Sequence, residues 1–376
     1  MTALDQAPTP APTSAPTSAR SSGTTYQELL DDDARVAPDV LRWVSPMPPG
    51  PDFVPVERYT SPEFHRLEVE KLWKKVWQMA CREEDVPEVG DHITYDIAGI
   101  SILVVRSAPD TIQAFRNICL HRGRLLKESC GRDEELRCAF HGFAWNLDGS
   151  LKHVPCRWDF PQVDDSWRLP EVKVGVWGGF VFINMDLNSG TLEDHLGDLT
   201  AHFERWPLEK RYKQAHVAKI LRCNWKLAQE AFMEAYHVVA THPQLLAGIG
   251  DANTQYDVFG NFSRAMTPNG TPSPHLQWVP MQQEMLDAMF DRNLDEPIMV
   301  EVPVGDTARH VAGALRREAM VDVLGAVADQ LTDAEMCDSF YYTLFPNFHP
   351  WGAYNRIVYR FRPYGTRHDM AIMECM

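Results

Sequence analysis

Apolar and polar residues alternate along several short runs in the first half of the chain, as they do in half-buried antiparallel strands. Turn signals containing glycine separate some of these runs, at residues 148–149 and 178–179. Ahead of the runs, apolar residues recur at helical spacing after Ser61, which can cap a helix predicted over residues 61–81. The pattern therefore predicts a helix followed by a small antiparallel β domain. The predicted strands are residues 92–99, 101–107, 111–117, 136–140, 143–146, 171–177 and 180–185.

The second half of the chain changes to helical spacing and returns to strand patterns near the end. Residues 1–25 are rich in Ala, Pro, Thr and Ser, and such a segment buries too little apolar surface to fold, so we expect a disordered tail. A lead-in segment (26–54) and two domains (55–187 and 188–376) complete an α+β chain. The elements predicted for the second half are helices at 191–199, 202–206, 225–239, 280–290 and 307–329, and strands at 340–345, 356–362 and 371–375.

Composition and charge exclude some functions. The chain has no apolar run of the ~18 residues that a membrane helix needs, and we expect neither a membrane span nor a signal peptide. A net charge of −16 argues against nucleic acid and anionic membranes as partners. Eight scattered cysteines do not resemble a disulfide framework and predict reduced thiols in the cytoplasm.

Two mixed pairs of metal-binding residues stand out in the first domain. Cys119 and His121 form C-x-H, and Cys138 and His141 form C-x-x-H. Two thiolates and two imidazoles can hold one [2Fe–2S] cluster, with the cysteines on one iron and the histidines on the other, which is the Rieske arrangement. The competing interpretation is a structural zinc site, although zinc-finger spacing usually pairs Cys with Cys and His with His.

A second group of candidate ligands lies in the predicted helix at 225–239. Glu230, Glu234 and His237 fall at i, i+4 and i+7 and should share one helical face. Pro243 should end this helix near residue 241, so that His242 can turn back toward His237. Two imidazoles and one carboxylate form the facial triad of non-haem Fe(II) oxygenases, whereas the alternative is two ordinary histidines at a helix end. The opposite side of the helix should carry the apolar residues Leu227, Phe232 and Val239.

With both sets in view, the chain resembles the large (alpha) subunit of Rieske non-haem iron ring-hydroxylating oxygenases, from about residue 55 to the end. The matching segments are CLHRG, CAFHGFAWNLDG, NWKLAQEAFMEAYHVVATHP and LFPNF. The resemblance implies an antiparallel β Rieske domain and a helix-grip catalytic domain, in which a curved antiparallel sheet wraps around helices. It also implies that His237 and His242 bind the iron and that Glu234 is the electron bridge, in place of the family's usual aspartate. Asn224 and Tyr236 match positions near the iron.

The resemblance implies a terminal oxygenase in aromatic hydrocarbon catabolism. Electrons from NAD(P)H would arrive through a separate ferredoxin and/or flavin reductase, because the chain has no G-x-G-x-x-G dinucleotide motif. Dioxygen would then hydroxylate an aromatic or other apolar small molecule. A homotrimer, with or without a small beta subunit, would pass electrons from one cluster through His121 and Glu234 to a neighbour's iron.

Two other functions stay open from the sequence. An oxidative demethylase or other monooxygenase could use the same scaffold. An electron carrier that uses the cluster alone is a different class, and it would not need the second domain (188–376).

The third iron ligand has no clear candidate in the sequence. The family takes its iron carboxylate from a C-terminal helix that follows the final strands, and here the chain stops inside a predicted strand, so we expect a truncated chain with the ligand beyond Met376. Asp338 comes too early in the family order, Asp369 lies in a predicted turn and Glu374 lies within a predicted strand.

Overall fold

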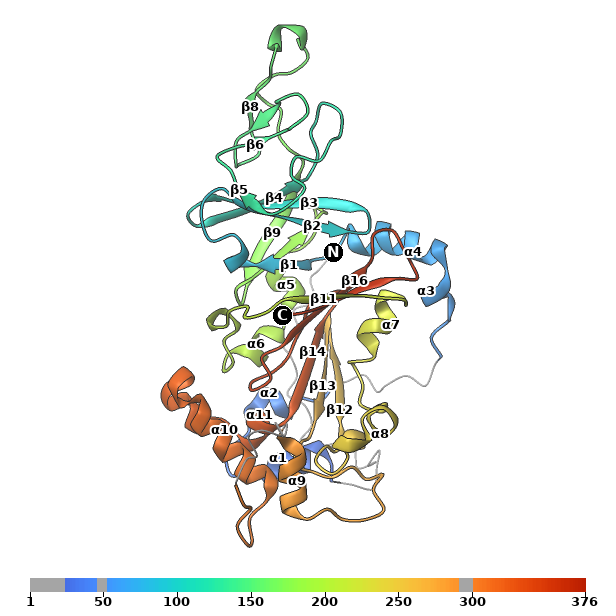
Figure 1. Cartoon of the computed structure of the whole chain (residues 1–376), viewed down its shortest axis with the longest axis vertical. Helices are drawn as coiled ribbons and strands as arrows, with labels where there is room; N and C mark the ends of the chain where they lie inside the picture. The colour runs from blue at the N-terminus through green and yellow to red at the C-terminus, as the bar shows by residue number, and fades with distance from the viewer. Residues whose placement is uncertain (1–23, 46–52, 291–299) are drawn as a thin grey trace, which may run out of the picture.

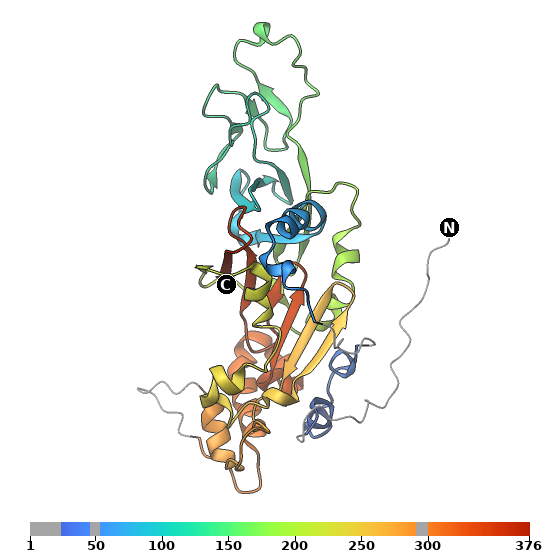
Figure 2. The same cartoon turned by 90° about the vertical axis from the view of Figure 1, so that its right-hand side faces the viewer.

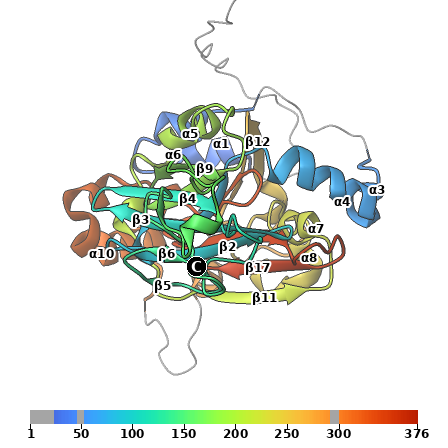
Figure 3. The same cartoon turned by 90° about the horizontal axis from the view of Figure 1, so that it is seen from above.

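The computed structural model describes residues 24–45, 53–290 and 300–376, so most of the predicted tail lies outside the described residues. Figure 1 shows an elongated molecule, with β6 (Leu136–Arg137) and β8 (Leu151–His153) at one end and α10 (Ala308–Leu324) toward the other. The elongation persists in the orthogonal view of Figure 2. Seen from above in Figure 3, α4 (Pro62–Glu68) and α10 lie on opposite sides of the sheets. None of the helices in the described residues has the length and apolarity needed to cross a bilayer.

A seven-stranded antiparallel sheet separates two cores in the first domain. Along β3, Ile102 and Val104 are buried in a core shared with the second domain. The intervening residues Leu103 and Val105 are buried in a core that also holds Cys119. Successive side chains of a strand point to opposite faces, so this near-continuous apolar run is a strand buried on both sides. The strands, in sheet order, are β1 (Gln78–Arg82), β10 (Phe180–Asn184), β9 (Glu171–Trp177), β4 (Thr111–Arg116), β3 (Ile100–Ala108), β2 (Asp91–Ile97) and β5 (Gly131–Arg132).

The second cluster loop joins β6 to β7 (Ala144–Trp145) of a separate three-stranded sheet, which β8 completes. The first cluster loop lies between β4 and β5 of the seven-stranded sheet. The predicted strands at 136–140 and 143–146 are therefore shorter than expected, because the residues between β6 and β7 form the second cluster loop.

The helix predicted over 61–81 is too long. Ser61 caps α4 as expected, since its Oγ accepts the N–H of Phe64 over 3.2 Å. The helix continues as a π-helical stretch to Trp73, and residues 78–82 form β1. The apolar run in β1 is fully buried, and a short buried strand cannot be distinguished from a buried helical turn by spacing alone. Among the described residues before α4, three short helices form, namely α1 (Tyr26–Asp31), α2 (Asp39–Arg42) and α3 (Glu57–Thr60).

The second domain is one curved antiparallel sheet with helices on both faces, which confirms the predicted α+β fold. The curved sheet has two parts, which are joined by isolated bridges from Tyr341 to Trp351 and from Leu344 to Phe348. The first part contains β11 (Val217–Leu221), β17 (Ala371–Cys375), β16 (Val358–Pro363) and β15 (His349–Pro350), and the second contains β12 (Gln255–Phe259), β13 (Phe262–Thr267) and β14 (Ser339–Leu344).

The helices divide between the two faces of this sheet. One face packs through Phe340, Tyr342 and Leu344 against a core that includes residues of α1, α5, α6 and α9–α11. The opposite face carries Phe361, which shares a core with Trp225 of α7. The helices introduced here are α5 (Leu192–Leu196), α6 (Leu199–Phe203), α7 (Trp225–Glu230), α8 (Val238–Thr241), α9 (Gln282–Met289) and α11 (Asp333–Cys337).

Asn347, in the LFPNF segment, forms hydrogen bonds between the two domains. Its Oδ1 accepts the N–H of Met79 over 2.9 Å, and its Nδ2 donates to the carbonyl of Met79 over 3.1 Å. The same amide nitrogen donates to the hydroxyl of Tyr95 over 3.0 Å. An amide side chain thus satisfies both backbone groups of a residue in β1, which fixes the orientation of the cluster domain on the catalytic domain.

Candidate metal centres and active site

The two predicted cluster loops are built in the same way. The carbonyl of Cys119 accepts the N–H of Gly123 over 2.9 Å, and the carbonyl of Cys138 accepts the N–H of Gly142 over 3.0 Å. Each cysteine N–H donates to the carbonyl five residues further along the chain, over 2.7 and 2.8 Å. Gly123 and Gly142 have φ values of +73° and +77°, the left-handed region that favours glycine. The glycine that follows each pair is therefore needed to close its loop.

These loops bring the four predicted cluster ligands together as two pairs, thiol with thiol and imidazole with imidazole. The thiols of Cys119 and Cys138 are buried and lie within hydrogen-bonding reach of each other. The rings of His121 and His141 lie 4.6 Å apart between centroids. The buried Nδ1 of His121 has no hydrogen-bond partner among the described residues, so it is free to bind a metal. A thiol pair and an imidazole pair are the two ligand sets that a [2Fe–2S] cluster of the Rieske type needs.

The surroundings of the pairs suit metal ligation. Burial raises the pKa of the Cys119 thiol, and the backbone N–H groups of His121 and Arg122 hydrogen-bond to its sulfur and oppose this rise. Such N–H···S bonds stabilise the thiolate and raise the reduction potential of a bound cluster. Burial also lowers the pKa of His121, with the nearby His141 and Arg122 acting in the same direction, which keeps the imidazole neutral.

The segment that carries the iron histidines is not one helix. The continuous helix predicted over 225–239 is wrong, because α7 ends at Glu230 and α8 begins at Val238. The N–H of Ala235, which a continuing helix would use internally, donates instead to the hydroxyl of Tyr256 over 2.9 Å. This bond comes from a distant strand, β12, and no local pattern predicts it.

The prediction that Glu230, Glu234 and His237 share one helical face is therefore wrong as well. Glu230 accepts the hydroxyl of Tyr59 over 2.9 Å, whereas Glu234 bonds His237. Leu227 and Val239, which were predicted to form the apolar face of this helix, are 45% and 38% exposed.

His237 and His242 nevertheless lie side by side. α8 ends at Thr241 as expected, and His242 leaves helical geometry with φ −129° and ψ 49°. The two rings are 5.5 Å apart between centroids. Oε1 of Glu234 lies 2.5 Å from Nδ1 of His237, and Oε2 accepts the N–H of His237 over 3.1 Å. With Nδ1 occupied, Nε2 is the nitrogen left for a metal, so the pair fits a mononuclear iron.

No third ligand joins these histidines in the part of the chain that the structure describes. Asp338 is buried and paired with Arg309, and Asp369 pairs with Arg367 over 2.7 Å. Glu374 pairs with Arg360 over 2.6 Å. Burial alone would raise the pKa of Glu374. The charge of Arg360 is the largest of several opposing effects, which together hold this pKa far below its usual range. Each of these three carboxylates therefore forms an ion pair with an arginine.

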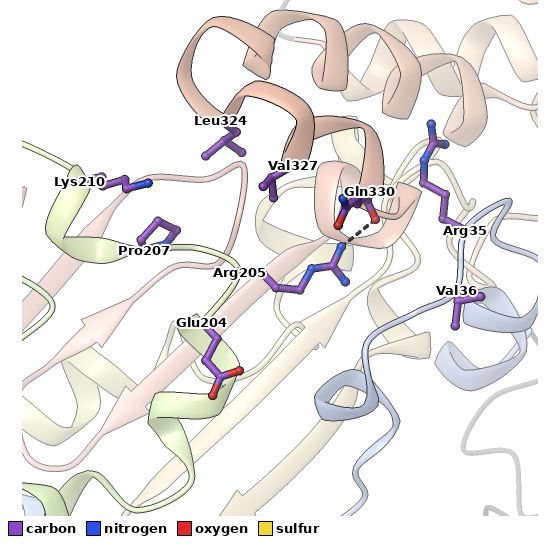
Figure 4. A pocket seen from close by; sticks show the side chains of 9 residues that line it. All are labelled: Arg35, Val36, Glu204, Arg205, Pro207, Lys210, Leu324, Val327 and Gln330. Atoms are coloured by element: carbon purple, nitrogen blue, oxygen red, sulfur yellow. Dashed lines mark hydrogen bonds between the residues drawn. The ribbon is translucent and has the colours of Figure 1, made fainter.

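A cavity of about 760 Å³ lies elsewhere, between the N-terminal segment and the end of α10 (Figure 4). Arg205 donates across it to the carbonyl of Gln330 over 2.7 Å. None of the candidate metal ligands lines this cavity. Its lining residues are Arg35, Val36, Glu204, Arg205, Pro207, Lys210, Leu324, Val327 and Gln330.

Comparison with known families identifies both domains. Residues 76–164 match the Rieske [2Fe-2S] domain, and residues 198–376 match the ring hydroxylating alpha subunit (catalytic domain). The chain therefore belongs to the Rieske non-haem iron oxygenases, as the large-subunit type. A Rieske [2Fe–2S] cluster and a mononuclear iron are the cofactors of this family.

The relatives include both monooxygenases and dioxygenases. The chain is 30% identical over 214 residues to the carnitine monooxygenase oxygenase subunit of Escherichia coli (strain K12), a match that covers 56% of this chain and 57% of that protein. It is 29% identical over 204 residues to chlorobenzene dioxygenase subunit alpha of Cupriavidus sp. (strain PS12), covering 51% of this chain and 45% of that one. The matches thus span about half the length of these curated relatives.

Solved structures share the fold. A quaternary ammonium Rieske monooxygenase, described for its carnitine oxidation and inter-subunit electron transfer, superposes with a TM-score of 0.62 at 19% identity, covering 89% of this chain and 79% of that one. Naphthalene 1,2-dioxygenase from Rhodococcus sp. bound to indole superposes with a TM-score of 0.61 at 20% identity, covering 86% of this chain and 72% of that one.

Proposed function

We propose that this chain is the terminal oxygenase component of a multicomponent system that hydroxylates an aromatic or other apolar small molecule. Cys119, His121, Cys138 and His141 would hold the Rieske cluster, and His237 and His242 would hold the iron. When bound, the cluster supplies one-electron transfer and Fe(II) supplies dioxygen activation. The observation that carries the proposal is the presence of both ligand sets in one chain. In addition, the Glu234 carboxylate is hydrogen-bonded to Nδ1 of His237, one of the two proposed iron ligands.

Glu234 would position His237 and provide the electron bridge. Its bond to Nδ1 fixes the tautomer of His237, so that the Nε2 lone pair is available to the metal. The side chains of Glu234 and His237 are 31% and 35% exposed, which leaves the carboxylate accessible to a further imidazole from outside the chain.

Electrons would pass between subunits. Figure 1 shows β6 and β8, in the small sheet that carries the second cluster loop, separated from α8 by the seven-stranded sheet. A cluster at that end suits the iron of a neighbouring subunit better than its own, and we propose a homotrimer, with or without a small beta subunit.

His141 is a better donor to this bridge than the expected His121. His121 stacks on Phe143 at 4.7 Å and meets Phe160 edge-on at 5.7 Å, whereas His141 is exposed. An imidazole on the surface can meet a carboxylate of another subunit without rearrangement of the loop.

The electron donor and location follow from the same chemistry. We propose a separate ferredoxin and/or flavin reductase that uses NAD(P)H, and a cytoplasmic location. All eight cysteines lie in the described residues and none forms a disulfide, as suits a reducing compartment. We also propose the domain limits 55–187 and 188–376, within which the two family matches fall.

Monooxygenation or oxidative demethylation is the second candidate. The relatives named for carnitine and glycine betaine are monooxygenases, whereas those named for chlorobenzene and anthranilate are dioxygenases. Counting ¹⁸O atoms incorporated from labelled dioxygen into each product would separate the two reactions.

The test is a substrate screen with a generic reductase, after anaerobic reduction of the purified protein. We expect a red-brown protein, the electron paramagnetic resonance signal of a cluster with mixed Cys and His ligands, and oxygen uptake that depends on substrate. His141→Ala should abolish the signal and the uptake, and His153→Ala, at an exposed histidine of the same domain, should preserve both. A colourless protein that holds zinc would refute the proposal.

A further inference from the structure

One face of the curved sheet carries a group of aromatic side chains. Tyr341 pairs with Trp351 across two strands, and His349 pairs with Tyr359. Directly paired residues of antiparallel strands share a face, and so do residues two apart along one strand. The ring contacts agree, because Tyr341 stacks on His349 at 5.8 Å and meets Trp351 edge-on at 5.4 Å. We call these four residues the aromatic group.

The segment that carries the iron histidines covers this face. Phe232 begins the segment, and its ring lies 4.9 Å from that of Tyr359 and 6.2 Å from that of Tyr341. Further along, the N–H of Ala235 reaches the hydroxyl of Tyr256 on β12 of the same sheet. Figure 1 shows α7 and α8 alongside these strands. The aromatic group therefore lies beneath the start of the segment that carries the residues proposed to bind iron.

Three polar atoms of the group lack a hydrogen-bond partner in the part of the chain that the structure describes. They are the buried Nε2 of His349, Nε1 of Trp351 and hydroxyl oxygen of Tyr341. His349 is fully buried, with its Nδ1 3.2 Å from the hydroxyl of Thr343. Buried polar groups are nearly always hydrogen-bonded, so two unpartnered nitrogens on adjacent side chains of one face point to a ligand.

The group is uncharged. Burial lowers the pKa of His349 to about 3, so its imidazole is neutral at physiological pH. Arg211 reaches the backbone carbonyl of Trp351 rather than its indole, over 3.4 Å. An anionic substrate would therefore find no counter-charge among these side chains.

We propose, resting on the proposed oxygenase function, that the aromatic group is the substrate-binding face and selects a neutral aromatic compound bearing a hydroxyl or carbonyl oxygen. The indole N–H of Trp351 donates to this oxygen. The Nε2 of His349 is the second partner and can either accept from a hydroxyl or donate to a carbonyl. The rings of Phe232, Tyr341 and Tyr359 contact the apolar part of the molecule.

The test compares the binding of four probes of similar size to this chain with its metals in place. The probes are naphthalene, 1-naphthol, 1-naphthoate and N,N,N-trimethyl-1-naphthylammonium, with affinities measured by calorimetry in the absence of reductant. We expect 1-naphthol to bind about tenfold more tightly than naphthalene, because its hydroxyl can hydrogen-bond to the unpartnered nitrogens and naphthalene has no such group. Trp351→Phe should remove most of this advantage while leaving naphthalene binding nearly unchanged. Trp278→Phe, at a half-exposed tryptophan, should change neither affinity.

Several results would overturn the inference. Equal binding of naphthol and naphthalene would show that the nitrogens do not meet the ligand. Equal weakening of both by Trp351→Phe, with cluster and iron contents unchanged, would assign Trp351 to packing alone. Tightest binding of the naphthoate or of the quaternary ammonium would assign a charged substrate. Because binding is measured without turnover, a preference for naphthol in a protein that never takes up oxygen would keep the inference and refute the proposed function.

Discussion

The cluster loops and the iron-histidine segment both present metal-binding side chains, but different forces hold them in place. The cluster loops are held mainly by backbone hydrogen bonds, since each cysteine both donates and accepts a main-chain hydrogen bond within its own loop. In the iron segment the chain leaves helical geometry after Glu230, and side chains from elsewhere hold it. Tyr59 bonds Glu230, and Tyr256 bonds the N–H of Ala235.

This difference predicts how each centre responds to substitution. A loop held by its own backbone bonds tolerates changes around it and depends chiefly on its ligands. A segment held by distant side chains loses geometry when any one of those contacts is removed, even though the ligands remain. The predictions below test that contrast, beginning with the largest effect.

Cys138→Ala should abolish the cluster completely. Cys138 is buried beside Cys119, and alanine offers no replacement ligand. Acid-labile sulfide and visible absorbance should fall to background while iron at the histidine site is retained. Cys156→Ala, which removes an exposed cysteine of the same domain, should change neither quantity. Retention of the cluster in Cys138→Ala would mean that the ligand set is wrong.

Glu234→Gln should slow turnover by about 10- to 100-fold while both metal centres stay occupied. The carboxylate holds Nδ1 of His237 at 2.5 Å, and an amide cannot accept from two imidazoles in the same way. Steady-state oxygen uptake and metal content check this expectation. The matched control is Glu318→Gln, at an exposed glutamate of α10, which should behave like the wild type. If Glu234→Gln turns over normally, the glutamate is only a solvated side chain.

Tyr256→Phe should weaken iron retention by about fivefold, the equivalent of one hydrogen bond worth about 1 kcal/mol. The substitution removes the hydroxyl that holds Ala235 and leaves the ring in place. The half-life of iron loss to a chelator measures the effect, and the cluster should be unaffected. Tyr364→Phe, at an exposed tyrosine, serves as control. Unchanged iron loss in Tyr256→Phe would show that the segment does not depend on this contact.

The sequence predicts local features of this molecule well. Each ligand pair of the cluster lies within a few residues of a glycine that closes the loop. The residues that determine the loop conformation are therefore part of the motif itself. The strands of the first domain are visible because their alternation is local, and β9 spans residues 171–177 as predicted. The turn before His242 is visible because Pro243 marks it.

Features that depend on distant partners could not be predicted. Tyr256 and Tyr59 belong to other parts of the chain, so the break in the helix after Glu230 leaves no local trace. The β12–β13 hairpin is a different matter, because Gly260-Asn261 between its strands is a two-residue turn signal from which a hairpin can be predicted. The aromatic group becomes visible only when register places residues 341 and 351 opposite each other.

The most direct test of the central claim, electron transfer between subunits through Glu234, is activity in mixed oligomers. Chains carrying His141→Ala, which lack a cluster ligand, would be co-expressed with chains carrying His237→Ala, which lack an iron ligand. Each variant alone should be inactive, and the account predicts that mixed oligomers recover substrate-dependent oxygen uptake, because an intact cluster in one chain meets an intact iron in its neighbour. Mixed oligomers that assemble with both metal centres yet stay as inactive as the single variants would contradict it.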